Sequence, residues 1–254
     1  MKWLRRCVAA FRFLTILPLP GSFGATDEDL AGSPLFFPVV GLVLGLIAGA
    51  CAWVLWRLVP PPVAAVLLTI ILFSFSGALH LDGLADSADG LFSARGRERI
   101  LVIMRDSRIG AMGVIALVMV LALKISSLSV LSRDEAVRAA LLIPISGRCA
   151  IVVMMALLPY VRPEGGLGTL FYSRNVKPAA LGGLLLLFLA GFLVMGLPGL
   201  IVAGAAMAAV AFFALFCRLK IGGATGDTLG ASCELAEAFI ALTLAALTVT
   251  GGLF

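Results

Sequence analysis

Seven apolar stretches, each about as long as a membrane-spanning helix, limit most strongly how this chain can fold. A bilayer core requires roughly 20 mostly apolar residues per helix. Prolines and glycines separate the stretches, as at 60–62 and 196–199, because proline ends a helix or occupies its first turn. The predicted spans are residues 36–56, 62–81, 111–131, 138–160, 178–196, 198–217 and 232–252.

The composition supports the same fold class. Hydrophobic residues make up 61% of the 254 residues and charged residues only 13%, whereas about a quarter of the residues of a soluble domain are charged. The five cysteines lie far apart without a CxxC pair and there is one histidine, so we expect no disulfide framework or zinc site. We predict an all-α, polytopic transmembrane bundle, with residues 1–254 forming a single integral membrane domain.

The N-terminal residues predict an amphipathic helix lying in the membrane interface. Trp3, Cys7 and Phe11 recur at helical spacing, while Lys2 and Arg12 lie elsewhere on the helical wheel. The segment is less typical of a signal peptide, because Arg12 interrupts its apolar region. We therefore expect this helix to contact membrane lipid.

The distribution of basic residues predicts which side of the membrane the N-terminus occupies. If it is cytoplasmic, the segments 1–35, 82–110, 161–177 and 218–231 hold 14 lysines and arginines, against 3 on the other side. Cytoplasmic loops carry such an excess of positive charge. We therefore predict a cytoplasmic N-terminus and an external C-terminus.

An acidic stripe follows the second predicted span. Asp82, Asp86 and Asp89 are spaced i, i+4 and i+7, so on a continued helix they fall within about 60° of one another. Three carboxylates so close repel one another, and Mg²⁺ binds such oxygens together with substrate phosphates. We predict a metal site on these aspartates, and we expect Gly83 and Gly90 to let a phosphate approach the backbone. A solvated acidic loop is the alternative.

Basic residues come directly after the acidic stripe. Arginine binds phosphate in a bidentate manner, so Arg95, Arg105 and Arg108 are candidate substrate-binding residues, together with Asp106 between the last two. Contacts with lipid headgroups would explain a basic segment here as well.

A second acidic segment, 222–237, begins the last span. Asp227 is predicted to close the metal site, although an acidic residue at a helix N-terminus can be a simple cap. Glu234 and Glu237 lie deeper, where carboxylates are functional by default, and are candidate substrate-binding residues. Lys124 and Arg148 also lie within spans and join these candidates. Lys124 can extend toward the outer interface, and Arg148 requires a carboxylate or a bound phosphate.

These motifs, taken together, resemble the cobalamin synthase family, whose systematic name is adenosylcobinamide-GDP ribazoletransferase. The similarity covers nearly the whole chain, in order. It is carried by HLDGLADSADG (80–90), MRDSRIGAMG (104–113), RPEGGLG (162–168) and GGATGDTLGASCELAE (222–237), with FLTILPLP (13–20) and FFPVVGLVLG (36–45). The glycines of 162–168 match neither a P-loop nor a dinucleotide fingerprint, and alone are a weak signal.

The resemblance implies an enzyme of the bacterial inner membrane that uses Mg²⁺ at its cytoplasmic face. Its substrates would be adenosylcobinamide-GDP and α-ribazole or α-ribazole 5′-phosphate, and its products adenosylcobalamin or its 5′-phosphate, and GMP. On this reading Asp82, Asp86, Asp89 and Asp227 hold the metal, and Asp89 or Asp227 accepts the proton of the attacking hydroxyl. His80 is a rival base, on a different side of the helix from the aspartates.

The family also looks distantly similar to the CDP-alcohol phosphotransferases, although three aspartates within eight residues depart from their motif. The alternatives are therefore a phospholipid-synthesising enzyme of that class, a cation-coupled transporter, or a structural membrane subunit. Clustering of the carboxylates at one membrane face favours chemistry over transport. We expect no nucleic-acid partner, and a homo-oligomer is compatible with the sequence.

Overall fold

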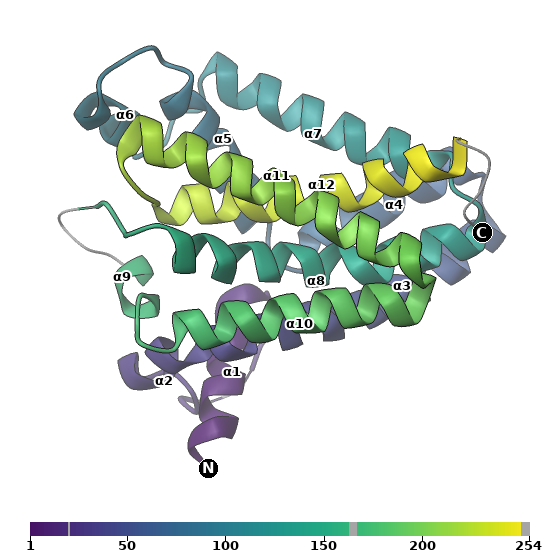
Figure 1. The fold of residues 1–254 in the computed structure, drawn as a ribbon, viewed down its shortest axis with the longest axis horizontal. Coiled ribbons are helices and arrows are strands. Elements are labelled where there is room, and N and C mark those ends of the chain that lie inside the picture. The colour runs from purple at the N-terminus through teal and green to yellow at the C-terminus, as the bar shows by residue number, and fades with distance from the viewer. Residues whose placement is uncertain (20, 163–166, 250–254) are drawn as a thin grey trace.

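A computed structural model describes residues 1–19, 21–162 and 167–249 of the chain, which fold into helices (Figure 1). The helices are α1 (Lys2–Leu14), α2 (Asp27–Gly32), the 3-10 helix η1 (Ser33–Phe36), α3 (Phe37–Leu58), α4 (Pro61–Ser74), α5 (Leu79–Leu91), α6 (Arg97–Ile103), α7 (Ala111–Ser129), α8 (Arg133–Leu157), α9 (Leu167–Phe171), α10 (Val176–Met195), α11 (Leu197–Ile221) and α12 (Gly226–Val249).

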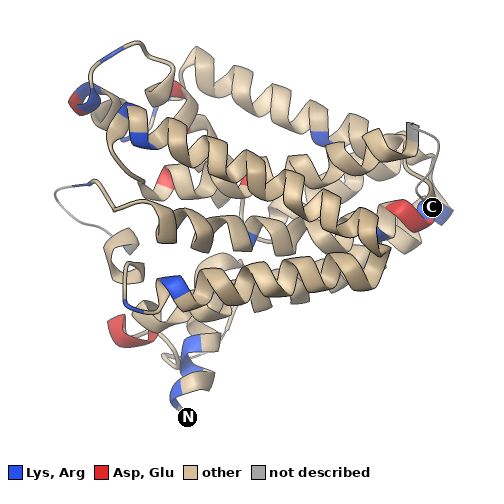
Figure 2. Cartoon of the chain, viewed as in Figure 1, with Lys and Arg blue, Asp and Glu red and all other residues tan. Residues whose placement is uncertain are grey.

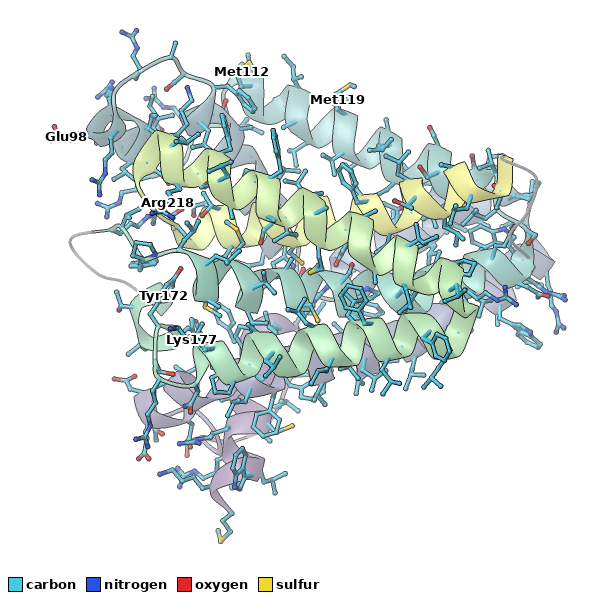
Figure 3. All side chains as sticks on the ribbon, in the orientation of Figure 1. Glu98, Met112, Met119, Tyr172, Lys177 and Arg218 are labelled. Atoms are coloured by element: carbon cyan, nitrogen blue, oxygen red, sulfur yellow. The ribbon has the colours of Figure 1, made fainter. Side chains whose placement is uncertain are left out.

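The predicted helical membrane bundle is confirmed. Among the described residues, six helical segments are long and apolar enough to cross a membrane, and α4 with α5 forms a further, bent pair. Outward-facing side chains of the bundle are apolar, as with Met112 and Met119 of α7, which are exposed and point away from it (Figure 3). Such exposed apolar surface is suited to contact with lipid.

The predicted span 62–81 is wrong as one continuous helix, because the chain turns by 90° between α4 and α5. Gly77 and Ala78 have φ angles of +59° and +62°, a left-handed conformation that costs a non-glycine residue roughly 1–2 kcal/mol. The N-terminal segment packs at this turn, where the backbone N–H of Ile16 donates to the carbonyl of Phe75 at 2.9 Å. The apolar pattern runs through the turn, so hydropathy alone did not reveal it.

Helix α8 lies at the centre of the bundle and packs against α3, α10, α11 and α12. Helices α1 and α2 project at one end, where α5, α6 and α9 also lie (Figure 1). Most charged residues gather at this end, with a smaller group at the opposite end (Figure 2). This arrangement matches the predicted grouping of polar segments on one side, and the orientation in the membrane stays a prediction.

Helix α1 is present, as predicted, and its basic side chains bind α2. Lys2 Nζ lies 2.6 Å from Glu28 Oε1, and Arg5 Nε lies 3.2 Å from Asp29 Oδ2. Trp3 remains 65% exposed, which leaves an apolar side chain available for the predicted contact with the membrane interface.

A row of glycines allows α3 and α8 to pack closely in an antiparallel manner. A Cβ added at Gly41 would lie 2.6 Å from the carbonyl oxygen of Pro144, and one at Gly45 would collide with the backbone of Leu141. Helices approach so closely in membranes where small residues recur every fourth position, because little apolar driving force exists between helices in lipid.

Four buried charged side chains connect α7, α8 and α12. Lys124 Nζ lies 2.6 Å from Glu234 Oε2 and 2.8 Å from Glu237 Oε2, while Arg148 Nη1 lies 2.7 Å from Glu237 Oε1. Each residue is at most 4% exposed. Two positive and two negative charges compensate one another, as burial requires. Arg148 therefore has the carboxylate partner that the sequence required, whereas the expected extension of Lys124 to the outer interface is wrong.

Replacing Gly45 with valine will destabilise the bundle by about 1–3 kcal/mol, because the added side chain must separate α3 from α8. The thermal unfolding midpoint of the purified protein in detergent measures the effect. Gly204→Val is the matched control, because a Cβ at Gly204 on α11 meets nothing within 4 Å. Equal midpoints for the two variants would contradict this packing argument.

Lys124→Met will destabilise the protein by roughly 3–5 kcal/mol, because it leaves two buried carboxylates without their shared cation. The double variant Lys124→Met/Glu234→Gln will recover part of the loss by restoring charge balance. Unfolding in detergent again provides the measurement. A double variant less stable than the single one would show that Lys124 and Glu234 are not coupled.

Candidate active site

The site is built where α5 crosses the first turn of α12. Both helices carry glycine at the crossing: a Cβ at Gly83 would lie 2.7 Å from the carbonyl oxygen of Asp227, and one at Gly230 would lie 3.3 Å from the Cα of His80. The two backbones therefore touch. This contact places two segments that are distant in the sequence, 80–90 and 222–237, at one position.

The crossing brings three of the predicted acidic residues together. Asp82 is exposed, Asp86 and Asp227 are partly buried, and the charges of Asp82 and Asp227 act on Asp86. The described residues donate no hydrogen bond to Asp82 or Asp86. These two carboxylates are therefore free to bind a cation or a substrate group.

Asp89, the third aspartate of the stripe, is already engaged by the backbone. Its Oδ2 accepts a hydrogen bond from the N–H of Gly110 at 2.6 Å, and its Oδ1 accepts one from the N–H of Gly113 at 2.8 Å. The carboxylate thus caps the N-terminus of α7, where a negative charge is favourable. The proposed roles of Asp89 as a metal ligand and proton acceptor stay predictions, and they compete with this cap.

Asp227 lies opposite an arginine that the sequence did not single out. Its Oδ2 accepts hydrogen bonds from Arg162 and, at 3.3 Å, from the hydroxyl of Thr225. Arg162 follows α8 and begins the glycine-rich segment 162–168, which was the signal that could have identified it. Residues 163–166 of that motif lie outside the described residues.

The predicted basic residues lie at the surface beside the site. Arg95, Arg105, Asp106 and Arg108 are all exposed. Arg108 binds Asp106 through its Nε at 3.1 Å and its Nη2 at 2.8 Å, and these hydrogen bonds lower the pKa of Asp106 to about 2. The charge of Arg105 reaches Asp227 and Tyr160. Arg105 is therefore electrostatically linked to the site, whereas Arg108 and Asp106 bind each other.

The buried residues predicted to bind substrate are not placed at this site. Lys124, Arg148, Glu234 and Glu237 bind one another, as described above, and their side chains do not line the cavity next to Asp82 and Asp227. Their need for charged partners is met within the protein. Direct substrate binding by these four residues stays a prediction that the geometry does not support.

The expectation that Gly83 and Gly90 open the backbone to a phosphate stays a prediction for Gly83, which lines the cavity next to Asp82, and is not supported for Gly90. Gly83 faces the backbone of Asp227, and a Cβ at Gly90 would lie 3.2 Å from the carbonyl oxygen of Ile100 and against the side chain of Met104. Both glycines allow close helix packing. Glycine is therefore needed at these two positions so that the helices that form the site can pack closely.

A cavity of about 240 Å³ opens next to these residues. Its polar side is formed by Asp82, Asp227, Arg162, Tyr160 and His80. Burial raises the pKa of Tyr160, while Arg162 acts in the opposite direction. His80 is 3% exposed, and its Nε2 has no hydrogen-bond partner among the described residues. The cavity thus offers carboxylates, one guanidinium and one imidazole to a ligand.

A larger groove, of about 730 Å³, lies on the opposite side of α5. It is lined by apolar residues of α5, α7, α11 and α12, among them Leu84, Phe92 and Phe216. It offers no carboxylate or arginine, so it cannot be the site of charge-dependent chemistry.

The carboxylates of the site can supply some, but not all, of the ligands of a Mg²⁺ ion. Mg²⁺ prefers carboxylate oxygens, commonly binds only one or two of them, and completes its coordination with water and substrate phosphates. Asp82 and Asp86 supply two such groups, and no described residue donates a hydrogen bond to either of them. Among the described residues no group of three or more acidic, histidine or cysteine side chains lies close enough together to hold a metal ion, so the metal site predicted on four aspartates stays a prediction.

Comparison with known proteins covers nearly the whole chain. The family described as cobalamin-5-phosphate synthase matches residues 6–245. A protein of Acetivibrio thermocellus named adenosylcobinamide-GDP ribazoletransferase is 41% identical, over 94% of this chain and 96% of its own length. Proteins with the same name from Geotalea daltonii, 39% identical over 99% and 100%, and Klebsiella pneumoniae, 41% identical over 93% and 97%, are also similar. No solved structure matches.

The matched region includes α5, the loop that carries Arg162 and the start of α12, so the helices that form the site lie within it. The resemblance found in the sequence motifs is thereby confirmed. The chain belongs to the cobalamin-5-phosphate synthase family.

Proposed function

We propose that the chain is an integral membrane adenosylcobinamide-GDP ribazoletransferase. It joins adenosylcobinamide-GDP to α-ribazole or its 5′-phosphate, releases GMP, and so completes the nucleotide loop of cobalamin. Family membership supports the reaction. The observation that carries the proposal within this chain is that Asp82, Asp227 and Arg162 line one cavity, with Asp86 near enough for its charge to interact with all three.

The reaction exchanges one phosphoester partner for another. The 3′-hydroxyl oxygen of the ribose forms a bond to the phosphorus next to the corrinoid side chain, and the bond from that phosphorus to the oxygen of GMP breaks. The hydroxyl proton must move to a base in the site. Asp227 is suited to this role, because Arg162 and Thr225 hold its Oδ2 in place and no described contact occupies its Oδ1.

Charge on the diphosphate must be neutralised as the leaving group departs. Arg162 lines the cavity and Arg105 acts on it electrostatically, so both can contact phosphoryl oxygens. Asp82 and Asp86 would hold Mg²⁺. When bound, Mg²⁺ supplies further positive charge to the phosphoryl oxygens.

The arrangement also supports a position in the cytoplasmic membrane with the site at the cytoplasmic face. The cavity lies at the end of the bundle where Lys177, Arg218 and Glu98 also lie (Figure 3). By the positive-inside rule, such a concentration of basic residues faces the cytoplasm.

Protein reconstituted in liposomes will convert adenosylcobinamide-GDP and α-ribazole into adenosylcobalamin and an equal amount of GMP. EDTA will abolish turnover, because without the metal the phosphoryl charge lacks a counterion. Adding Mg²⁺ will restore turnover. Liquid chromatography of corrinoids and nucleotides provides the measurement. Asp82→Asn will lower kcat by roughly 100-fold or more, whereas Asp134→Asn, at an exposed position of α8, will be active.

Two outcomes would contradict the proposal. Turnover of a CDP-linked donor in place of adenosylcobinamide-GDP would show a phospholipid enzyme, and ion flux without product would show a transporter. Full activity of Asp82→Asn would show that Asp82 is not a metal ligand.

Variants of Asp89 distinguish its role as the N-terminal cap of α7 from a role in the chemical reaction. If the cap is its main role, the Asp89→Ala variant will lose about 1–2 kcal/mol of stability, because two backbone N–H groups lose their acceptor. Asp89→Asn keeps one acceptor oxygen and will retain most of the stability and measurable activity. An Asp89→Asn protein that is stable and fully inactive would instead assign Asp89 to the metal or to proton transfer.

A further inference from the structure

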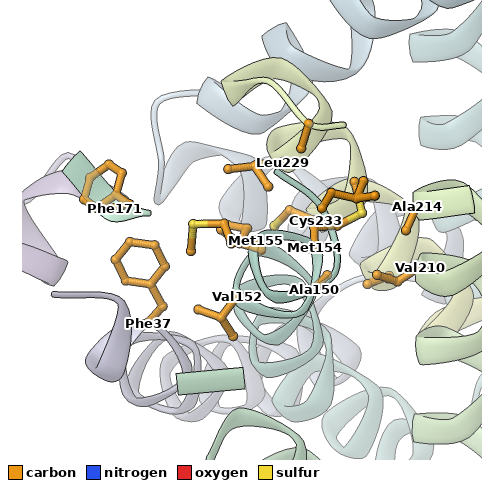
Figure 4. Close-up of a cluster of buried hydrophobic side chains, with 14 of the residues drawn as sticks. Phe37, Ala150, Val152, Met154, Met155, Phe171, Val210, Ala214, Leu229 and Cys233 are labelled. Carbon is orange, nitrogen blue, oxygen red and sulfur yellow. The ribbon is translucent and has the colours of Figure 1, made fainter. Parts of the chain in front are cut away.

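The cavity next to Asp82 and Asp227 has an apolar side that the reaction chemistry does not require. Opposite the charged residues it is lined by Phe13, Phe37, Phe171, Ile151 and Met155. These residues come from α1, α3, α9 and α8. Figure 4 shows Phe37, Phe171 and Met155 as neighbours in the buried hydrophobic cluster.

The three phenylalanines form a packed aromatic wall. The ring centroids of Phe13 and Phe171 are 4.5 Å apart, and those of Phe37 and Phe171 are 5.7 Å apart. Phe37 is 0% and Phe171 is 2% exposed. Aromatic rings favour offset-stacked or edge-to-face contact with another ring, and a thioether such as that of Met155 packs well against a ring edge. Phe13 is partly exposed and presents the accessible part of this wall, while the buried rings of Phe37 and Phe171 pack against it. The wall is therefore suited to a flat, apolar ring system.

The volume of the cavity indicates which of the two substrates can enter it. Pockets that enclose drug-sized ligands have about 300–1,000 Å³, and this one has about 240 Å³. A corrin macrocycle cannot enter it, whereas a fused two-ring heterocycle can. α-Ribazole has such a group, because its base is a benzimidazole with two methyl groups, attached to a polar ribose.

Two residues that line the cavity have a buried polar atom without a hydrogen-bond partner among the described residues, His80 at Nε2 and Arg162 at Nε. His80 Nε2 accepts or donates no hydrogen bond among the described residues, although the side chain is only 3% exposed. Buried polar atoms are nearly always hydrogen-bonded. A ring nitrogen of a heterocycle or a ribose hydroxyl placed in the cavity would supply the partner.

We propose that this cavity binds α-ribazole, with the benzimidazole against Phe13, Phe37 and Phe171, the ribose toward Asp82 and Asp227, and His80 bonded to a nucleoside heteroatom. This inference rests on the proposed function. The adenosylcobinamide-GDP then approaches from the exposed side, where Asp82 and Arg105 lie. The aromatic wall selects the base and directs the ribose hydroxyl toward the carboxylates.

Steady-state kinetics of Phe171→Ala test this assignment. We expect the KM for α-ribazole to rise at least tenfold, with the KM for adenosylcobinamide-GDP unchanged within about twofold, because the variant removes contact with the base alone. Phe216→Ala is the control, since this aromatic residue lies in the separate apolar groove. An unchanged KM for α-ribazole, or an equal rise for both substrates, would overturn the assignment.

A second measurement avoids any loss of folding in the variant. In the wild-type enzyme, free 5,6-dimethylbenzimidazole will inhibit competitively against α-ribazole and not competitively against adenosylcobinamide-GDP. Competition with the corrinoid substrate alone would overturn the assignment. Equilibrium dialysis of the same base against wild type and Phe171→Ala needs no turnover. It tests the cavity even if the proposed reaction fails, and equal binding to both proteins would count against the cavity.

Discussion

The close crossing of α5 and α12 is the contact on which the site depends. Gly83 and Gly230 face the partner backbone, and no side chain larger than hydrogen fits at Gly83 without moving α12. Because the backbones touch, Asp82 and Asp227 reach the same cavity although they lie 145 positions apart in the sequence. A small shift between these helices would change the distance between the two carboxylates directly.

The buried charges keep α12 in the position that this crossing requires. Asp227 lies in the first turn of α12, whereas Glu234 and Glu237 lie about two to three turns further into the bundle and bind Lys124 and Arg148. Burying charges is expensive unless each is paired, so the four residues tolerate few other arrangements of α7, α8 and α12. Carboxylates on one helix therefore have different roles according to depth: the first faces the cavity, and the deeper two hold the bundle together.

Local patterns predicted well what depends on neighbouring residues, and poorly what depends on distant ones. Hydropathy located the membrane helices, and helical spacing placed Asp82, Asp86 and Asp89 along α5. Spacing could not show that Asp89 binds the backbone of Gly110 and Gly113, because that contact joins two helices. The partners of Lys124 and Arg148 were out of reach for the same reason.

Some of the site was also hidden by residue type. Arg162 looked like one more basic residue of a cytoplasmic loop, and only its contact with Asp227 distinguishes it. The phenylalanines of the cavity wall resembled ordinary core or membrane-facing residues in an apolar sequence. Three separate segments bring them together, so no periodicity within one helix could identify them.

The bend before α5 explains how one short helix serves two different surroundings. A straight continuation of α4 would carry the aspartates away from the bundle end, whereas the 90° turn lays α5 against α7 and α12. Asp82 then lines the cavity of the site, while Leu84 and Leu91 on the opposite side of α5 line the apolar groove. The left-handed conformation of Ala78 costs roughly 1–2 kcal/mol. The two hydrogen bonds that Asp89 of α5 accepts from the backbone of Gly110 and Gly113 can offset this strain, because hydrogen bonds to a charged group contribute about 1.5–3 kcal/mol each.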